Sequence, residues 1–146
     1  MPASAGEISA AARRWMAVLL VVISLIVAAY WLSWLLHRSL VAVETSKGYV
    51  QFEDAFPLAD GILVVCLLAS AFSLLTGRGA ALFWLLVGGG AGLYLFAMDD
   101  LYDLQHGIWG KGTNGIIELI INLVTLVLSL FVLWWTWSHR EGLRPA

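Results

Sequence analysis

Four long runs of apolar residues dominate the chain, at positions 15–36, 58–75, 80–98 and 116–137. Each run is close to the ~20 residues that a helix needs to cross the hydrocarbon core of a bilayer. The apolar residues follow one another without a period of two, which favours helices over the strands of a barrel. The pattern therefore predicts an all-α membrane protein. We expect an antiparallel bundle of four transmembrane helices, forming a single membrane domain over residues 1–146.

Short polar segments separate the runs and define how they connect. Residues 76–79 form a tight turn, so the second and third helices must be antiparallel neighbours. The longer segment 37–57 is compatible with a short interfacial helix. Residues 99–106 can extend the third helix beyond the core, with Gly107 as its C-terminal cap. Asn114 is the expected N-cap of the fourth helix.

Two local patterns leave alternatives open. Arg13 and Arg14 precede the first run, which makes a cleaved signal peptide an alternative to a transmembrane helix. The run continues for several residues past a weak cleavage site, and no soluble domain follows, so the helix is favoured. In the third run, Gly88 and Gly92 have the spacing that lets helix backbones approach closely. A hinge is the alternative there.

Residues 1–12 are expected to be frayed.

Composition excludes several classes of protein. Hydrophobic residues make up 61% of the chain and charged residues 12%, against roughly 25% charged in soluble domains. The single cysteine, Cys66, excludes a disulfide framework and any multi-cysteine metal motif. There is no basic cluster, so a nucleic-acid partner is not expected. The expected partners are the lipid bilayer and either further copies of the chain or another membrane protein.

The basic residues predict an orientation. Five arginines fall at one end of the predicted bundle and three basic residues at the other. Because short cytoplasmic loops carry more Lys and Arg, the first end is expected in the cytoplasm. We therefore predict a multi-pass protein of the plasma (inner) membrane with both termini cytoplasmic. The two sets are Arg13, Arg14, Arg78, Arg140 and Arg144 against Arg38, Lys47 and Lys111.

The acidic residues are distributed more unevenly still. Eight of the ten map to the outer end, and only Glu7 and Glu141 map to the cytoplasmic end. Few cations accompany them, so they would crowd together without neutralisation. Such a cluster can hold protons, bind a cation or spread apart in water. The eight are Glu44, Glu53, Asp54, Asp60, Asp99, Asp100, Asp103 and Glu118.

Three of the predicted helices, the second with Asp60 together with the third and fourth, aim carboxylates at one outer layer of the bundle. Asp99, Asp103 and His106 lie at positions i, i+4 and i+7 of a helix, which places them on one stripe. Glu118 and Asn122 share a face of the fourth helix. Oxygen ligands with one imidazole suit Mg²⁺, Ca²⁺, Mn²⁺ or Zn²⁺. The candidate metal ligands are Asp99, Asp103, His106 and Glu118, then Asp60 and Glu53, with Asn122 and Asn114 as supporting polar groups.

A simpler interpretation of the same residues is a solvated helix end without a ligand. In that case Glu118 only favours the positive end of its helix, and His106 is a capping residue. Residues 110–115 match G-x-G-x-x-G, but they lack the preceding strand and the acidic residue about 20 positions later. We therefore expect no nucleotide cofactor.

Three functions remain open. The leading one is a non-enzymatic accessory or binding protein with an outward-facing carboxylate/histidine pocket that holds a divalent cation. The second is a small ion- or proton-coupled transporter or channel that uses Glu118, Asp60 and Asp99. The third is a membrane-embedded, metal-dependent hydrolase acting at the outer interface, with Glu118 or Asp103 as general base. The sequence does not decide whether the chain is an enzyme.

Overall fold

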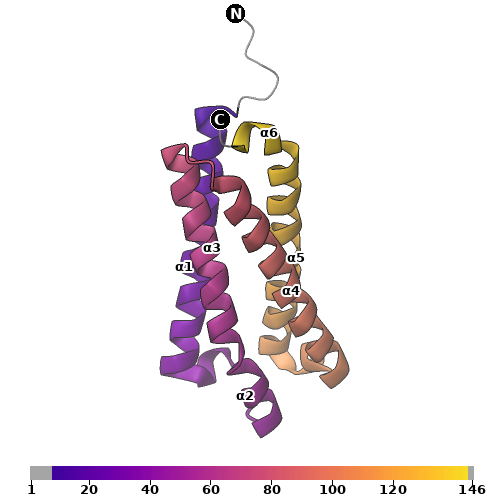
Figure 1. The fold of residues 1–146 in the computed structure, drawn as a ribbon. Helices are drawn as coiled ribbons and strands as arrows, with labels where there is room; N and C mark the ends of the chain where they lie inside the picture. The colour runs from indigo at the N-terminus through magenta and orange to yellow at the C-terminus, as the bar shows by residue number, and fades with distance from the viewer. Residues whose placement is uncertain (1–7, 145–146) are drawn as a thin grey trace, which may run out of the picture.

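Within residues 8–144, which the computed structural model describes, the chain is helical and has no β-strand. Four long helices follow one another, joined by short segments (Figure 1). They are α1 (Ala10–Val41), α3 (Phe56–Thr76), α4 (Ala81–His106) and α5 (Gly112–Ser138). Three short helices complete the chain: α2 (Lys47–Glu53), the 3₁₀ helix η1 (Ile108–Gly110) and α6 (Arg140–Leu143). Of the segment 1–12 expected to be frayed, residues 1–7 lie outside the described range and residues 10–12 belong to α1.

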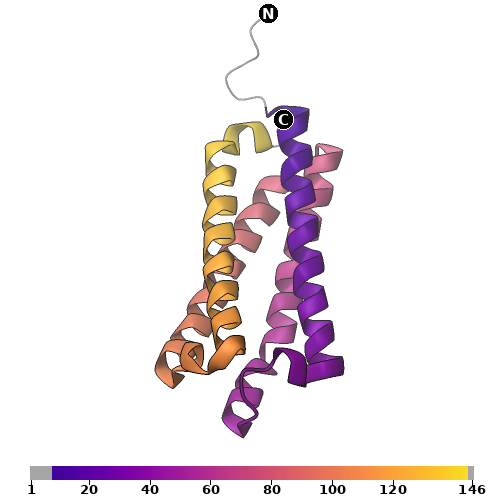
Figure 2. The same cartoon turned by 180° about the vertical axis from the view of Figure 1, so that it is seen from behind.

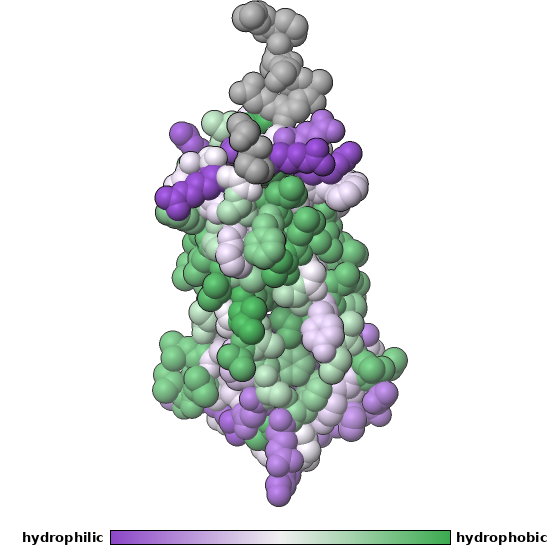
Figure 3. All heavy atoms as spheres, viewed as in Figure 1, coloured by the Kyte–Doolittle hydropathy of each residue, from purple (hydrophilic) through white to green (hydrophobic). Residues whose placement is uncertain are grey.

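The long helices present apolar side chains to their surroundings. All four are long and apolar enough to cross a membrane, counting α2 and α3 as one candidate span. Leu25, Val65 and Val127 leave 64%, 60% and 62% of their surfaces exposed. Figure 3 shows mainly apolar residues over the middle of the molecule and hydrophilic residues at its two ends. The prediction of an all-helical chain with four long apolar helices is confirmed.

The helix ends follow from local sequence signals. The first helix was expected to end at residue 36, and the backbone does leave helical geometry at His37 (φ −143°, ψ 55°) before α1 resumes to Val41. α4 continues to His106 and ends at Gly107, whose φ of +62° is the left-handed conformation that favours glycine. Gly77 ends α3 in the same way, with φ +68°. The predicted cap at Gly107 is confirmed.

The expected N-cap role of Asn114 is wrong. The segment after α4 closes as the 3₁₀ turn η1, which brings the chain into helical geometry early, so α5 already begins at Gly112 with Lys111 in the N-cap position. Asn114 therefore lies inside the first turn of α5. Its Nδ2 donates a hydrogen bond of 2.9 Å to the carbonyl of Ala42. The side chain ties the start of α5 to the segment that follows α1.

The helices pack in series rather than as a closed ring. α1 packs along α3, α3 along α4, and α4 along α5. α1 and α5 have at most sparse contact with each other, although both border the same side of the molecule (Figure 2). The start of α1 and the helix α6 lie at one end, which we call the termini end. α2 and η1 lie at the opposite end, which we call the loop end (Figure 1).

Glycines allow α4 to approach both of its neighbours. A Cβ atom at Gly88 would lie 3.3 Å from the Leu67 side chain of α3. A Cβ atom at Gly89 would lie 2.8 Å from Cγ of Leu133 on α5, and one at Gly92 would lie 2.5 Å from the Ser129 hydroxyl of α5. The glycines therefore serve two interfaces, as expected of small residues at helix contacts.

We predict that Gly89→Ala destabilises the protein and that Gly90→Ala does not. The added methyl group at position 89 collides with the branch point of Leu133, whereas a Cβ at Gly90 has no atom within 4 Å. Overpacking of this kind costs about 1–3 kcal/mol. Thermal unfolding of the two variants in the same detergent measures the difference. Equal melting temperatures would contradict the close approach of α4 and α5.

Candidate functional site

Three carboxylates from three helices converge at the loop end. Glu53 is the last residue of α2, Asp99 lies in α4, and Glu118 lies in α5. Each offers one oxygen atom, and these three atoms all lie within 4.8 Å of one another. Glu53 and Glu118 are only 3% and 4% exposed, and Asp99 is partly buried. We call these residues the carboxylate triad.

Aromatic packing holds Glu53 in this position. The Phe52 ring stacks on the Tyr102 ring of α4, with centroids 3.8 Å apart and planes 9° apart. The Tyr49 ring is fully buried and packs edge-on against Trp34 of α1. These contacts fix α2 against α1 and α4, so its last residue turns toward α5. The position of Glu53 is therefore a consequence of tertiary packing.

The triad has no positive partner among the described residues. Within residues 8–144 the ion pairs are Arg38–Asp54 and Lys111–Glu44, and neither includes a triad residue. Oε1 of Glu53 is buried without any hydrogen-bond partner. Buried carboxylates normally pair with cations or hydrogen-bond donors, because an isolated charge in an apolar interior is costly. The triad is thus an acceptor-rich site to which no described residue supplies a cation.

The triad lies at one end of a cavity of about 290 Å³ that is open to the surface of the protein. The cavity reaches along α4 from Asp99 to Gly88, and its other walls come from α1, α3 and α5. Asp60 of α3 lines the same cavity and accepts a hydrogen bond of 2.6 Å from Nε1 of Trp31. Asp60 is therefore close to the triad but already holds a donor.

Asp103 is a structural connector next to the triad. It is fully buried, and its Oδ2 accepts hydrogen bonds of 3.0 Å from Nε1 of Trp109 and from Nδ2 of Asn122. These bonds join α4 to the segment around η1 and to α5. Its second oxygen, Oδ1, is buried without a partner. Asn122 thus supports Asp103 and also lines the cavity.

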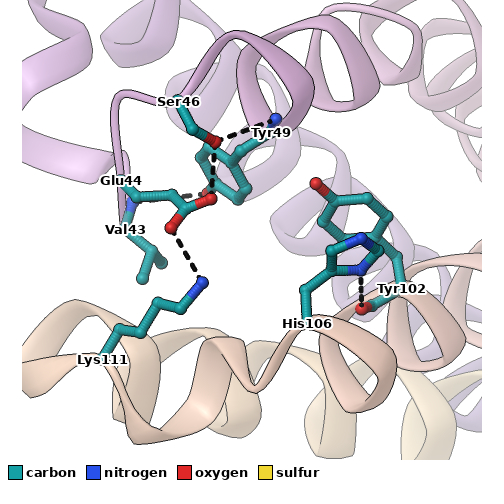
Figure 4. Close-up of polar contacts among 7 residues, drawn as sticks. All are labelled: Val43, Glu44, Ser46, Tyr49, Tyr102, His106 and Lys111. Atoms are coloured by element: carbon teal, nitrogen blue, oxygen red, sulfur yellow. Dashed lines mark hydrogen bonds and ion pairs between the residues drawn. The ribbon is translucent and has the colours of Figure 1, made fainter.

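His106 lies apart from the triad, at the surface of the loop end. Its ring stacks on Tyr102 with centroids 4.0 Å apart, and its Nδ1 lies 2.8 Å from the Tyr102 carbonyl oxygen (Figure 4). Of the six candidate ligands, the structure brings Glu53, Asp99 and Glu118 together. It places Asp60 in the same cavity, Asp103 beside it and His106 outside.

Sequence reasoning missed the contribution of α1. Tyr30 and Trp31 of α1 line the cavity, whereas sequence reasoning named no residue of this helix as part of a site. It also ranked Glu53 behind Asp103 and His106. Asp60 could have pointed to Trp31. A buried indole N–H needs an acceptor, and Asp60 is an acceptor near the start of the next long helix.

An ion pair closes the rim of the loop end. Nζ of Lys111 lies 2.8 Å from Oε2 of Glu44, and the Ser46 hydroxyl donates to Oε1 of Glu44 at 2.7 Å (Figure 4). The hydrogen bond from Lys111 is the main cause that lowers the pKa of Glu44, followed by that from Ser46. The pair links the α1–α2 connection to the start of α5.

Comparison of the chain with protein-family models, with curated proteins and with solved structures gives no match.

We predict that the Lys111–Glu44 pair stabilises the protein at neutral pH and not in acid. A lowered pKa in the folded state stabilises the fold above the unfolded pKa of about 4.3. That contribution is lost as the pH falls through the folded pKa. Lys111→Met should therefore cost about 0.2–1 kcal/mol near neutral pH, the range for exposed pairs, and nothing at about pH 2. Thermal unfolding at both pH values is the measurement.

Lys47→Met is the matched control, because Lys47 is exposed and forms no ion pair with any described residue. A loss for Lys111→Met that persists at low pH would show that the lysine acts through its aliphatic stem.

Proposed function

We propose that the chain is an integral membrane protein of four antiparallel transmembrane helices that binds a divalent cation at the carboxylate triad. It acts as a binding or accessory component of the plasma membrane. Both termini face the cytoplasm, and the triad lies near the outer surface. The excess of arginine at the termini end and of acidic residues at the loop end supports this orientation.

The observation that carries the proposal is the unpartnered Oε1 of Glu53, buried within reach of two further carboxylates. Three carboxylates within 4.8 Å of one another repel strongly in surroundings of low dielectric constant. Charged groups at membrane depth face the bundle interior or water and pair with an opposite charge. A bound cation supplies that charge, which none of residues 8–144 provides.

The donor set favours a hard cation. All three groups offer carboxylate oxygens, which suit Mg²⁺, Ca²⁺ and Mn²⁺. Three carboxylates leave coordination positions for water, as Mg²⁺ in particular requires. The imidazole of His106 is turned toward Tyr102, so the proposed site differs from the carboxylate/histidine set expected from the sequence.

The lining of the deeper part of the cavity supports a binding function and argues against transport of ions across the membrane. Toward the middle of the helices, its described walls are residues such as Leu67, Gly88 and Val132, and their polar groups are the hydroxyls of Thr125 and Ser129, with no ionisable side chain among them. A path for ions across one subunit would need ionisable groups at this depth. The triad therefore resembles a binding site at one end of the protein more than a step in a channel.

We predict that the purified protein binds one divalent cation per chain and that Asp99→Asn abolishes this binding. Loss of a ligand should weaken binding by more than the ~10–100-fold that loss of an outer-shell partner costs. Elemental analysis after dialysis against Mg²⁺, Ca²⁺ or Mn²⁺ measures the stoichiometry, and melting temperature with and without the metal measures the linkage.

Asp100→Asn is the matched control, because Asp100 is the next residue of α4 and is not part of the triad. It should bind the metal as the unaltered protein does. The proposal would be overturned if the unaltered protein bound no stoichiometric metal and no metal raised its melting temperature. Equal loss in both variants would assign any binding to diffuse surface charge.

We also predict the orientation of the termini. In a Cys66→Ser background, a membrane-impermeant maleimide added to spheroplasts should label Thr45→Cys at the loop end and not Ser138→Cys at the termini end. Both positions are exposed, and Cys66 itself is buried. Labelling of Ser138→Cys alone would reverse the orientation and place the triad near the cytoplasm.

A further inference from the structure

The cavity has the acidic triad at one end and mainly apolar walls below it, and a metal ion at the triad would contact only the acidic end. We propose that it binds a single-chain amphiphile with a primary ammonium head, which enters from the bilayer between α1 and α5. The ammonium group occupies the carboxylate triad, and the hydrocarbon chain fills the cavity toward Gly88.

The triad matches an ammonium head in charge and in number of acceptors. A primary ammonium has three N–H donors. When it donates three charge-assisted bonds of about 2.8 Å in tetrahedral directions, the acceptor oxygens lie about 4.6 Å apart. The triad oxygens lie within 4.8 Å of one another, and Oε1 of Glu53 is a buried acceptor without a donor. The triad can therefore accept all three bonds.

The walls below the triad suit a hydrocarbon chain. Ile26 and Val27 of α1 line the cavity on one side, and Val124 and Leu128 of α5 line it on the other. From Asp99 to Gly88 the cavity follows α4 over eleven residues, which corresponds to about 16 Å of helix. A volume of about 290 Å³ exceeds the roughly 150 Å³ that holds a benzene molecule. It has room for one extended chain and not for the two chains of a phospholipid.

The series packing of the helices provides the entrance. α1 and α5 have at most sparse contact, and both contribute walls to the cavity. Ile26 is 63% exposed and Val124 is 49% exposed, so these walls continue onto the surface that faces lipid. A chain can move sideways from the bilayer into the cavity without leaving apolar surroundings.

This inference shares the triad with the proposed divalent cation and predicts that the two ligands compete. It does not require the metal, because the ammonium head carries its own positive charge. The two proposals can therefore fail separately.

The test uses the protein in phosphatidylcholine nanodiscs with dodecylamine, which is protonated at neutral pH, as the probe. Native mass spectrometry counts the adducts. We expect one dodecylammonium to bind per chain. Its binding should be at least ~10-fold tighter than that of dodecyltrimethylammonium, because the latter has no N–H donor. It should also be at least ~10-fold tighter than that of dodecanoate, which is an anion. Glu118→Gln should weaken binding of dodecylammonium by a similar factor, and Mg²⁺ should displace it.

Two substitutions on one helix separate filling of the cavity from general effects of a larger residue. Val124→Trp places an indole in the cavity wall, whereas Val127→Trp places it on the lipid-facing surface of α5, where Val127 does not line the cavity. Binding should be lost in the first variant and kept in the second. Ile26→Trp tests the α1 wall if Val124→Trp unfolds.

Four outcomes would overturn the inference. The first three are equal binding by Val124→Trp and Val127→Trp, undiminished binding by Glu118→Gln, and a co-purified diacyl phospholipid that dodecylamine does not displace. Stoichiometric metal without dodecylammonium binding would refute this inference and leave the divalent-cation proposal intact. Dodecylammonium binding without metal binding would support this inference and refute the divalent-cation proposal.

Discussion

The arrangement of the helices depends on the close approach of α4 to α3 and α5. Gly88, Gly89 and Gly92 remove the side chains that would otherwise hold these helices apart. The close approach of the backbones adds van der Waals contacts between the helices, and these contacts set the positions of α3 and α5. Among the described long helices α1 packs mainly on α3, and the side between α1 and α5 stays loosely closed. The cavity is a direct consequence of this serial packing.

The acidic residues divide into two groups according to where the few cations can reach. Asp54 accepts bonds of 2.9 Å from Arg38 and from Nε1 of Trp34, and Glu44 pairs with Lys111. All of these contacts lie at the rim, where long basic side chains remain partly in water. Inside the rim, no basic side chain of the described residues reaches the triad. The acidic residues that pair with a cation at the rim stabilise the loop end. The triad carboxylates, which have no such partner, remain available to a ligand.

The sequence was sufficient for the features that depend on local rules. The apolar runs gave the long helices, and Gly107 gave the end of α4 because its left-handed conformation is a local requirement. The composition of the site was harder to predict. Glu53 reaches the triad because contacts with other helices hold α2 in place, among them the stacking of Phe52 on Tyr102, fifty positions away. His106 shares a helical stripe with Asp99, yet its ring turns onto the Tyr102 side chain, where stacking and a backbone contact hold it. Side-chain choices of this kind depend on neighbours from other helices.

Asp103 and Glu53 are both buried acidic residues at the loop end, but their surroundings give them different roles. Each has a buried oxygen without a partner. The other oxygen of Asp103 accepts from Trp109 and Asn122, so substitution of Asp103 would break contacts between α4, α5 and η1 as well as remove a charge. The Glu53 side chain has no such hydrogen bond with a described residue, and one of its oxygens lies within 4.8 Å of an oxygen from each of two other carboxylates. Loss of ligand binding with a retained fold is therefore expected from changes in the triad. Changes at Asp103 should affect folding first.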